Sequence, residues 1–403
     1  MTEQAKVPAI RFAGFTDPWE QRKLGELFEE SDERASDREI LSVSVANGIY
    51  PASESDRETN PGASLANYKI VHFGDVVYNS MRMWQGAVDA SRYDGIVSPA
   101  YVVARPNSEV YARFFARLLR QPMLLKQYQQ VSQGNSKDTQ VLKFDDFASI
   151  GISMPASENE QRRIGGFFDR LDSLITLHQR KYDKLVILKK SMLEKMFPKD
   201  GESVPEIRFA GFTDPWEQRK LEDIANRVTR KNEGESDLPL TISSQYGLVD
   251  QRTFFNNQVA SKDMSGYYLL RKGEFAYNKS TSGDSPWGAV KRLVRYEKGC
   301  VSTLYICFGL DGADPDFLVT YYETDRWYKA VQMIAAEGAR NHGLLNIAPN
   351  DFFDTALILP PSREEQELIG LFFARLDNLI TLHQRKLELL QNIKKSLLDK
   401  MFV

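Results

Sequence analysis

The chain repeats itself. Residues 7–24 read VPAIRFAGFTDPWEQRKL and residues 204–221 read VPEIRFAGFTDPWEQRKL, so this arm motif differs at one position. A second repeat, the helix motif, pairs residues 167–197 with residues 372–402 and is identical at 21 of 31 positions. A period near 200 residues is too long for a solenoid. The sequence therefore predicts two copies of one unit, each a domain followed by a helix.

The segments between these motifs have diverged, although they share a skeleton. Gly74, Tyr78 and Asn79 in the first copy match Gly273, Tyr277 and Asn278 in the second. Nearly identical ends and different middles indicate that the ends meet the same kind of partner while the middles meet different ones. Uneven drift after a recent duplication is the alternative.

Composition places the chain among ordinary globular proteins. Of its 403 residues, 42% are apolar and 27% are charged, which argues against a largely disordered or membrane-embedded chain. We see no apolar run near the ~18–20 residues of a spanning helix and no secretory signal at the start, so we expect a cytoplasmic protein. Cys300 and Cys307 lie in one strand-like run, where they should be too far apart to form a disulfide.

The net charge of −3 hides strong local asymmetry. Residues 26–58 carry ten acids against three bases, whereas residues 110–143 carry six bases against one acid. Residues 262–298 and 162–199 are also basic, with eight bases against four acids and ten against four. Such stretches could present basic surfaces to a polyanion or could be solvated helix faces, and charge counts do not separate the two.

Each middle is predicted to be a β-rich α/β domain. Short β-rich runs bounded by turn residues occur at 43–46, 68–71, 75–78, 100–104 and 150–154. Residues 111–130 have a helical pattern that Pro122 should kink or split, and residues 315–336 are the counterpart. The fold class is therefore α+β.

The helix motifs contain a heptad pattern over four heptads, which predicts two long helices that pack lengthwise. The seam positions are Leu171, Ile175, His178, Tyr182, Leu185, Met192, Leu376, Ile380, His383, Leu387, Leu390 and Leu397. We expect an antiparallel coiled coil within the chain, with an approximate two-fold and the domains about 50 Å apart at its ends. A coiled coil between separate chains is the competing arrangement. His178 and His383 have no cysteine or carboxylate companions, so we interpret them as packed seam residues and expect no metal.

Several catalytic signatures are missing from the sequence. It has no Walker phosphate loop, GxGxxG, HExxH or GxSxG motif. It also lacks the acid-x-Lys of a metal nuclease after Pro315-Asp316 and the Asn/Asp-Pro-Pro-aromatic element of an amino-methyltransferase. We therefore expect a chain with no catalytic residues of its own.

The two paired motifs and the duplicated domain-plus-helix plan resemble the DNA-sequence specificity subunits of type I restriction–modification systems. The resemblance covers essentially the whole chain. It implies target-recognition domains at 1–158 and 207–362, spacer helices at 159–197 and 363–403, and a linker at 198–206. It also implies that each domain reads one half of an asymmetric bipartite site on double-stranded DNA. The partners implied are two methyltransferase subunits and two motor-nuclease subunits, which would hold S-adenosylmethionine, ATP and Mg, so that no cofactor is expected in this chain.

Base reading requires exposed polar or cationic side chains on loops. We expect them in two loops of each domain, around residues 79–86 and 132–137 and around residues 278–287 and 338–342. The candidates in these loops are Arg82, Trp84, Gln85, Gln133, Asn135, Ser136, Lys137, Lys279, Ser280, Ser282, Arg340, Asn341 and His342, and Ser244 and Gln245 are added from outside them. For Tyr78 and Tyr277 we favour a place in the core. A structural adaptor that pairs two identical proteins without reading DNA is the alternative function.

Overall fold

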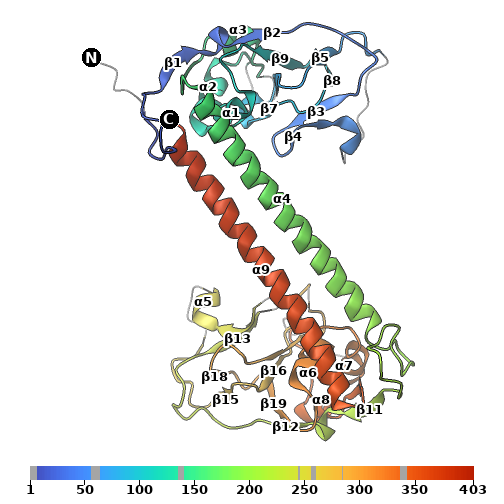
Figure 1. Cartoon of the computed structure of the whole chain (residues 1–403). Coiled ribbons are helices and arrows are strands. Elements are labelled where there is room, and N and C mark those ends of the chain that lie inside the picture. The colour runs from blue at the N-terminus through green and yellow to red at the C-terminus, as the bar shows by residue number, and fades with distance from the viewer. Residues whose placement is uncertain are drawn as a thin grey trace. The chain divides into compact units, whose positions relative to one another are not determined.

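The computed structural model describes residues 7–55, 64–134, 140–243, 246–255, 260–283, 285–335 and 343–403. The chain divides into two compact units (Figure 1). Unit 1 is Met1–Gln179 with Arg385–Val403, and unit 2 is Arg180–Gln384. Each unit therefore combines one α+β domain with parts of both long helices.

Unit 1 contains a four-stranded antiparallel sheet in the order β2-β9-β6-β7 and three two-stranded ribbons, β3-β4, β5-β8 and β1-β10. The strands are β1 Glu20–Lys23, β2 Phe28–Glu30, β3 Leu41–Ser44, β4 Gly48–Pro51, β5 Lys69–Val71, β6 Val76–Asn79, β7 Val88–Ala90, β8 Gly95–Val97, β9 Tyr101–Pro106 and β10 Gly151–Met154.

Strand β6 is buried on both faces, because successive side chains of a strand point to opposite sides. Val76 and Tyr78 join a core on the helical side of the sheet, and Val77 joins a second core with residues of β3 and β4. Tyr78 is fully buried, as expected from the sequence, and burial raises the pKa of its hydroxyl well above the usual value.

Three short helices, α1 Ala112–Leu118, α2 Pro122–Val131 and α3 Phe144–Ala148, cover the sheet of unit 1. The single helix expected at 111–130 is split at Pro122, which occupies the first position of α2. The strands β1, β2, β4, β7 and β8 were not expected. Each is three or four residues long, too short to show a pattern.

The long helices are α4, Glu158–Lys195, and α9, Arg363–Met401. In unit 1 the start of α4 packs against the end of α9. The rings of Phe168 and Phe402 lie 6.0 Å apart, and Lys394 pairs with Asp172 at 2.5 Å. In unit 2 the end of α4 packs against the start of α9, where the rings of Phe197 and Phe373 lie 6.2 Å apart. The helices are therefore antiparallel in each unit, and the pairing is made within one chain.

The predicted seam positions of both helices are buried or half-buried, while most residues between them are exposed. No helix in the described ranges is long and apolar enough to cross a membrane.

The arm motif connects the two helices of its own unit. In unit 1, Arg11 donates two hydrogen bonds to buried Glu160 of α4, at 2.5 and 2.6 Å, and the Ile10 amide donates to the Lys400 carbonyl of α9. In unit 2, Arg208 binds Glu365 in the same way, at 2.7 and 2.8 Å. The repeated arm motif therefore makes equivalent contacts with the long helices in both units.

Unit 2 has the same plan, with a sheet in the order β12-β19-β16-β17 and the ribbons β13-β14, β15-β18 and β11-β20. Its strands are β11 Glu217–Lys220, β12 Ala225–Arg227, β13 Leu240–Ser243, β14 Gly247–Asp250, β15 Tyr268–Arg271, β16 Phe275–Asn278, β17 Ala289–Arg292, β18 Lys298–Val301, β19 Ile306–Leu310 and β20 Ala356–Leu359. Its short helices are α5 Gln251–Phe255, α6 Pro315–Tyr321, α7 Tyr328–Ile334 and α8 Pro349–Phe353.

The two cysteines require a correction. They do not share one strand: Cys300 lies in β18 and Cys307 in β19, because residues 302–305 turn between the two strands. Both are free and buried, so the conclusion that they are not bonded to each other holds for a different geometric reason.

Candidate nucleic-acid interface

The first loop predicted to read DNA in unit 1 lies beside the described residues that flank the second. Residues 80–87 connect β6 to β7, and the Leu142 amide donates a 2.9 Å hydrogen bond to the Ser80 carbonyl. Gln133 and Val141 form a β-bridge that holds the start of the second loop beside this connection. The sequence indicated each loop separately, and the fold brings them together.

The side chains of the first loop differ in their freedom to contact a ligand. Arg82 and Gln85 are exposed and contact each other at 3.4 Å. Trp84 is half-buried against the core, and its indole N–H donates to the Met81 carbonyl. Gln133 is exposed and donates to the Asp146 carboxylate at 2.9 Å. Arg82 and Gln85 are thus the described candidates of unit 1 best placed to reach a base edge.

Arg120 has a role that the sequence did not indicate. From just beyond α1 it donates to the Gly86 carbonyl at 3.0 Å and to the Val45 carbonyl at 2.8 Å. It therefore ties the first loop to the tip of the β3-β4 hairpin. Burial lowers the pKa of this guanidinium, although a nearby carboxylate, Asp89, opposes the effect. No local sequence signal marks an arginine whose partners are backbone carbonyls.

The same juxtaposition recurs in unit 2. The Leu345 amide donates to the Lys279 carbonyl at 2.9 Å, and the Thr281 amide donates to the Gly343 carbonyl at 2.6 Å. Ser280 and Ser282 are exposed on this loop. Lys279 is turned inward, because its ammonium donates to the Ile347 carbonyl at 3.2 Å and burial lowers its pKa. Lys279 is therefore better placed to hold the loop than to contact DNA.

The remaining candidates lie outside the described residues. They are Asn135, Ser136, Lys137, Ser244, Gln245, Arg340, Asn341 and His342.

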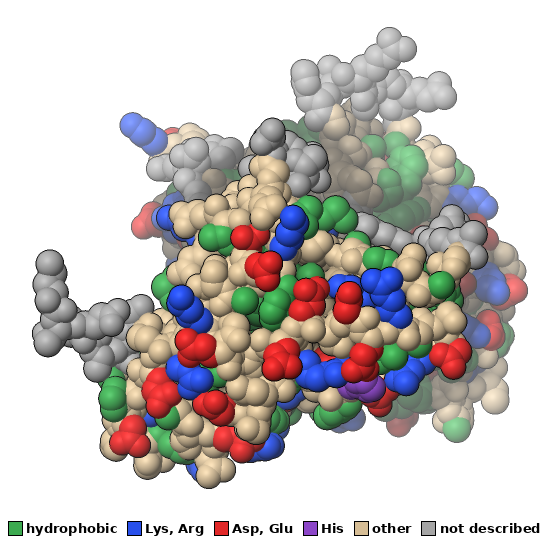
Figure 2. Space-filling view, turned by 90° about the horizontal axis from the view of Figure 1, so that it is seen from above, with side chains coloured by type: hydrophobic (Ala, Val, Ile, Leu, Met, Phe, Trp, Pro, Cys, Tyr) green, Lys and Arg blue, Asp and Glu red, His purple; other side chains and the backbone are tan. Residues whose placement is uncertain are grey.

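Unit 1 carries mixed charge on the face seen in Figure 2, where acidic and basic side chains alternate. Unit 1 also contains ion pairs between such side chains. Arg105 pairs with Glu33 at 2.8 Å, Lys69 pairs with Glu30 at 3.1 Å, and His72 lies 3.4 Å from Glu33. Such a surface does not attract a polyanion strongly.

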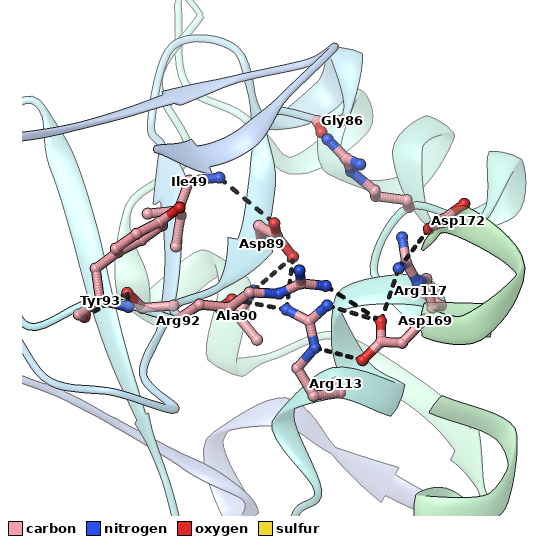
Figure 3. Close-up of polar contacts among 12 residues, drawn as sticks. Ile49, Gly86, Asp89, Ala90, Arg92, Tyr93, Arg113, Arg117, Asp169 and Asp172 are labelled. Carbon is pink, nitrogen blue, oxygen red and sulfur yellow. Dashed lines mark hydrogen bonds and ion pairs between the residues drawn. The ribbon is translucent and has the colours of Figure 1, made fainter. Parts of the chain in front are cut away.

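The basic stretch at 110–143 is neither a free basic surface nor a solvated helix face along α1. Figure 3 shows the guanidinium groups of Arg113 and Arg117 converging on Asp169 of α4. Arg113 binds Asp169 through two hydrogen bonds of 2.7 and 2.9 Å, and Arg117 binds Asp169 at 3.0 Å and Asp172 at 2.6 Å. Both arginine side chains are nearly buried, at 13% and 12% exposed. These cations therefore fix the domain to α4.

A cleft of about 900 Å³ opens beside this cluster in unit 1, lined by Tyr50, Arg92, Arg120, Gln121 and Lys394 among others. A smaller cleft of about 460 Å³ lies at the corresponding place in unit 2, beside Lys189, Lys291 and Glu323. Among the residues that the structure describes, no group of three or more histidine, cysteine or carboxylate side chains could hold a metal ion.

Comparison with known proteins gives the class of this fold and site. Residues 16–186 match the family described as "Type I restriction modification DNA specificity domain". The S subunit of a type I restriction–modification system from M. genitalium has the same fold, with 13% identity, a TM-score of 0.54 and 99% of each chain covered. The HsdS subunit from Thermoanaerobacter tengcongensis is also similar, at 16% identity and a TM-score of 0.44, over 97% of this chain and 98% of the other. No curated protein gave a significant match.

Most of the first recognition domain and the first part of α4 thus match a type I restriction–modification DNA specificity domain, and unit 2 repeats the fold of unit 1. The match bears out the resemblance expected from the sequence over these residues, and the likeness to the M. genitalium S subunit extends the fold over 99% of the chain. The adaptor alternative, in which no DNA is read, is not favoured.

Proposed function

We propose that each unit reads one half of an asymmetric bipartite DNA target and that the two helices set the spacer between the halves. The observation that carries this proposal is the contrast between framework and loops. Both units have the same strand order and the same paired loops, yet Arg82, Trp84 and Gln85 of the first loop stand where unit 2 has a longer, serine-rich segment. Equal frameworks with unequal loops are suited to reading two different half-sites.

The exposed side chains of the helix motif support docking of two identical partner subunits. Leu174 and Leu177 are 46% and 47% exposed in unit 1, and their counterparts Leu379 and Leu382 are 43% and 46% exposed in unit 2. Exposed apolar side chains at equivalent positions of both helices are typical of a surface that contacts another protein. In this proposal two methyltransferase subunits dock here, and two motor-nuclease subunits complete the complex.

The cofactors follow from this division of labour. S-adenosylmethionine, ATP and Mg would be bound by the partner subunits, and the chain would hold none itself. Because the substrate is cellular DNA, we place the protein in the cytoplasm.

Exchange of the first domain tests the reading function. Residues 25–158 are replaced by the middle of a relative with another specificity, and methylation by the assembled complex is mapped. We expect one half-site to change and the other to remain. An unchanged methylated sequence would contradict the proposal. Binding of the native complex to duplex DNA should also weaken steeply as salt rises, whereas a flat, negligible signal would favour an adaptor.

Substitution of the repeated leucines tests the docking surface. The double variant Leu174→Glu/Leu177→Glu should reduce assembly with the methyltransferase, measured by analytical ultracentrifugation. Ile187→Glu is the matched control, because Ile187 is 69% exposed but its counterpart in α9 is Asn392. Equal effects of the two variants would argue against this surface.

A further inference from the structure

The two recognition domains, domain 1 (residues 1–158) and domain 2 (residues 207–362), contact the long helices through side chains of opposite charge. The packing of one glycine in each long helix establishes which residues of the two units correspond. An added Cβ at Gly165 of α4 would lie 3.0 Å from the Phe114 amide nitrogen, and one at Gly370 of α9 would lie 2.6 Å from the Phe317 amide nitrogen. Phe114 therefore corresponds to Phe317, and Gly165 to Gly370.

In this register the helices offer the same ion pair to both domains. Asp172 pairs with Lys394 at 2.5 Å in unit 1, and the corresponding Asp377 pairs with Lys189 at 2.6 Å in unit 2. The helices differ one turn earlier, where α4 has Asp169 and α9 has Ala374. Unit 1 therefore presents one more carboxylate to its domain than unit 2 does.

The domains differ in the opposite sense. Arg113 and Arg120 of unit 1 correspond to Asp316 and Glu323 of unit 2, so two cations are replaced by two anions. The change is reversed on the neighbouring strand, where Asp89 pairs with Val77 in unit 1 and Lys291 pairs with the corresponding Ala276 in unit 2.

The contacts follow these charges. Domain 1 engages the anionic member of the helix pair, through Arg117 and Asp172 at 2.6 Å. Domain 2 engages the cationic member, through Glu323 and Lys189 at 2.6 Å. Burial opposes the charge on Lys189, but Glu323 and Asp377 outweigh it and raise its pKa.

We propose that this exchange is a positional code, in which Asp169 and the charges facing it admit each recognition domain only at its own helix start. Domain 2 placed on α4 would direct Asp316 toward Asp169, since Arg113 occupies that place in unit 1. Domain 2 would bring the same two cations that it has in unit 2, Arg292, which pairs with Asp316 at 2.8 Å, and Lys291, which lies 3.8 Å from Glu323, so the added carboxylate of Asp169 would have no added cation. Domain 1 placed on α9 would leave Arg113 facing Ala374 in place of its bidentate partner. The order of the two half-sites in the target is then fixed by docking as well as by reading.

A chimaera tests the code. Residues 222–362 replace residues 25–157, so that domain 2 stands at both positions and a symmetric target is expected. The chain is assembled with its methyltransferase, and methylation of that target is compared with and without Asp169→Ala. We expect the chimaera with Asp169 to methylate at least about tenfold more slowly, because like charges facing each other disfavour docking. Equal rates would overturn the proposal.

A point variant of the native chain gives a readout that needs neither DNA nor a partner. Ala374→Asp places a carboxylate opposite Asp316, and hydrogen exchange of residues 315–321 is expected to accelerate. Asn378→Asp adds the same charge at an exposed position of α9 and is expected to leave that exchange unchanged. If Ala374→Asp behaves like Asn378→Asp, the code is refuted, even where the chimaera does not fold. If the native complex fails to methylate DNA, the proposed function fails, and this measurement still decides the code.

Discussion

Removing Arg11 of the arm should destabilise unit 1 far more than removing Arg162, an exposed arginine at the start of α4. The Arg11 side chain is 11% exposed and its partner Glu160 is 1% exposed, joined by two hydrogen bonds of 2.5 and 2.6 Å. Arg11→Ala would leave a buried carboxylate without its cation, which typically costs about 3–5 kcal/mol. Arg162 pairs with Glu158 at 2.5 Å, but these side chains are 56% and 44% exposed, so Arg162→Ala should cost at most about 1 kcal/mol.

The assay is urea denaturation combined with hydrogen exchange, because a chain of two units need not unfold in one step. Arg11→Ala should accelerate exchange in unit 1 and leave unit 2 unchanged, and Arg208→Ala should do the reverse. The double variant Arg11→Leu/Glu160→Leu should recover most of the loss, since no buried charge remains. If Arg11→Ala costs no more than Arg162→Ala, the pair does not secure the arm.

Three further outcomes are expected. Gly165→Ala should lower the stability of unit 1 by about 1–3 kcal/mol in thermal unfolding, because its Cβ would press on the Tyr111 ring and the α1 backbone. Gly166→Ala is the control: its Cβ meets nothing within 4 Å, so this variant should stabilise the unit by about 0.5–1 kcal/mol. Arg120→Ala should accelerate hydrogen exchange at residues 44–48 and relax selectivity at one half-site in methylation mapping, while Arg162→Ala should do neither. Burial raises the pKa of Cys300 to about 11 and of Cys307 to about 12, so both thiols should resist iodoacetamide at pH 8 in the native protein and react once it is unfolded. Rapid labelling of the native chain at pH 8 would contradict the burial of these thiols. Because the pKa values of the two thiols are higher in the folded than in the unfolded chain, their contribution to the free energy of unfolding is complete below about pH 8.5 and should be lost as the pH rises toward 11–12.

The long helices could be predicted from sequence because a heptad pattern is a local signal that extends over many residues. Pro122 likewise marked the division between α1 and α2, since proline acts through its own ring. The short strands could not be recognised, because three or four residues hold too little periodicity. Cys300 and Cys307 were assigned to one strand for the same reason.

The candidate site was predictable only in part. Exposed polar residues between β6 and β7 marked a loop, and Arg82 and Gln85 are exposed there. The contact of that loop with residues 140–142 depends on tertiary packing, which no local pattern encodes. Lys279 was predicted to contact DNA, and its ammonium donates to a backbone carbonyl in the structure. The basic residues of α1 are bound to Asp169. A sequence shows which residues are positively charged, but it does not show which groups those charges bind in the folded protein.

The way unit 1 is assembled has a consequence for its biogenesis. Its main core contains Phe168 together with Met401 and Phe402, and all of unit 2 is encoded between them. A ribosome therefore releases the first domain without the helix end that closes its core, although domains ordinarily fold in the order in which they emerge. During that interval the apolar face of the nascent α4 start is exposed, so we expect chaperone binding to ribosome-bound chains to persist until the second domain has left the exit tunnel.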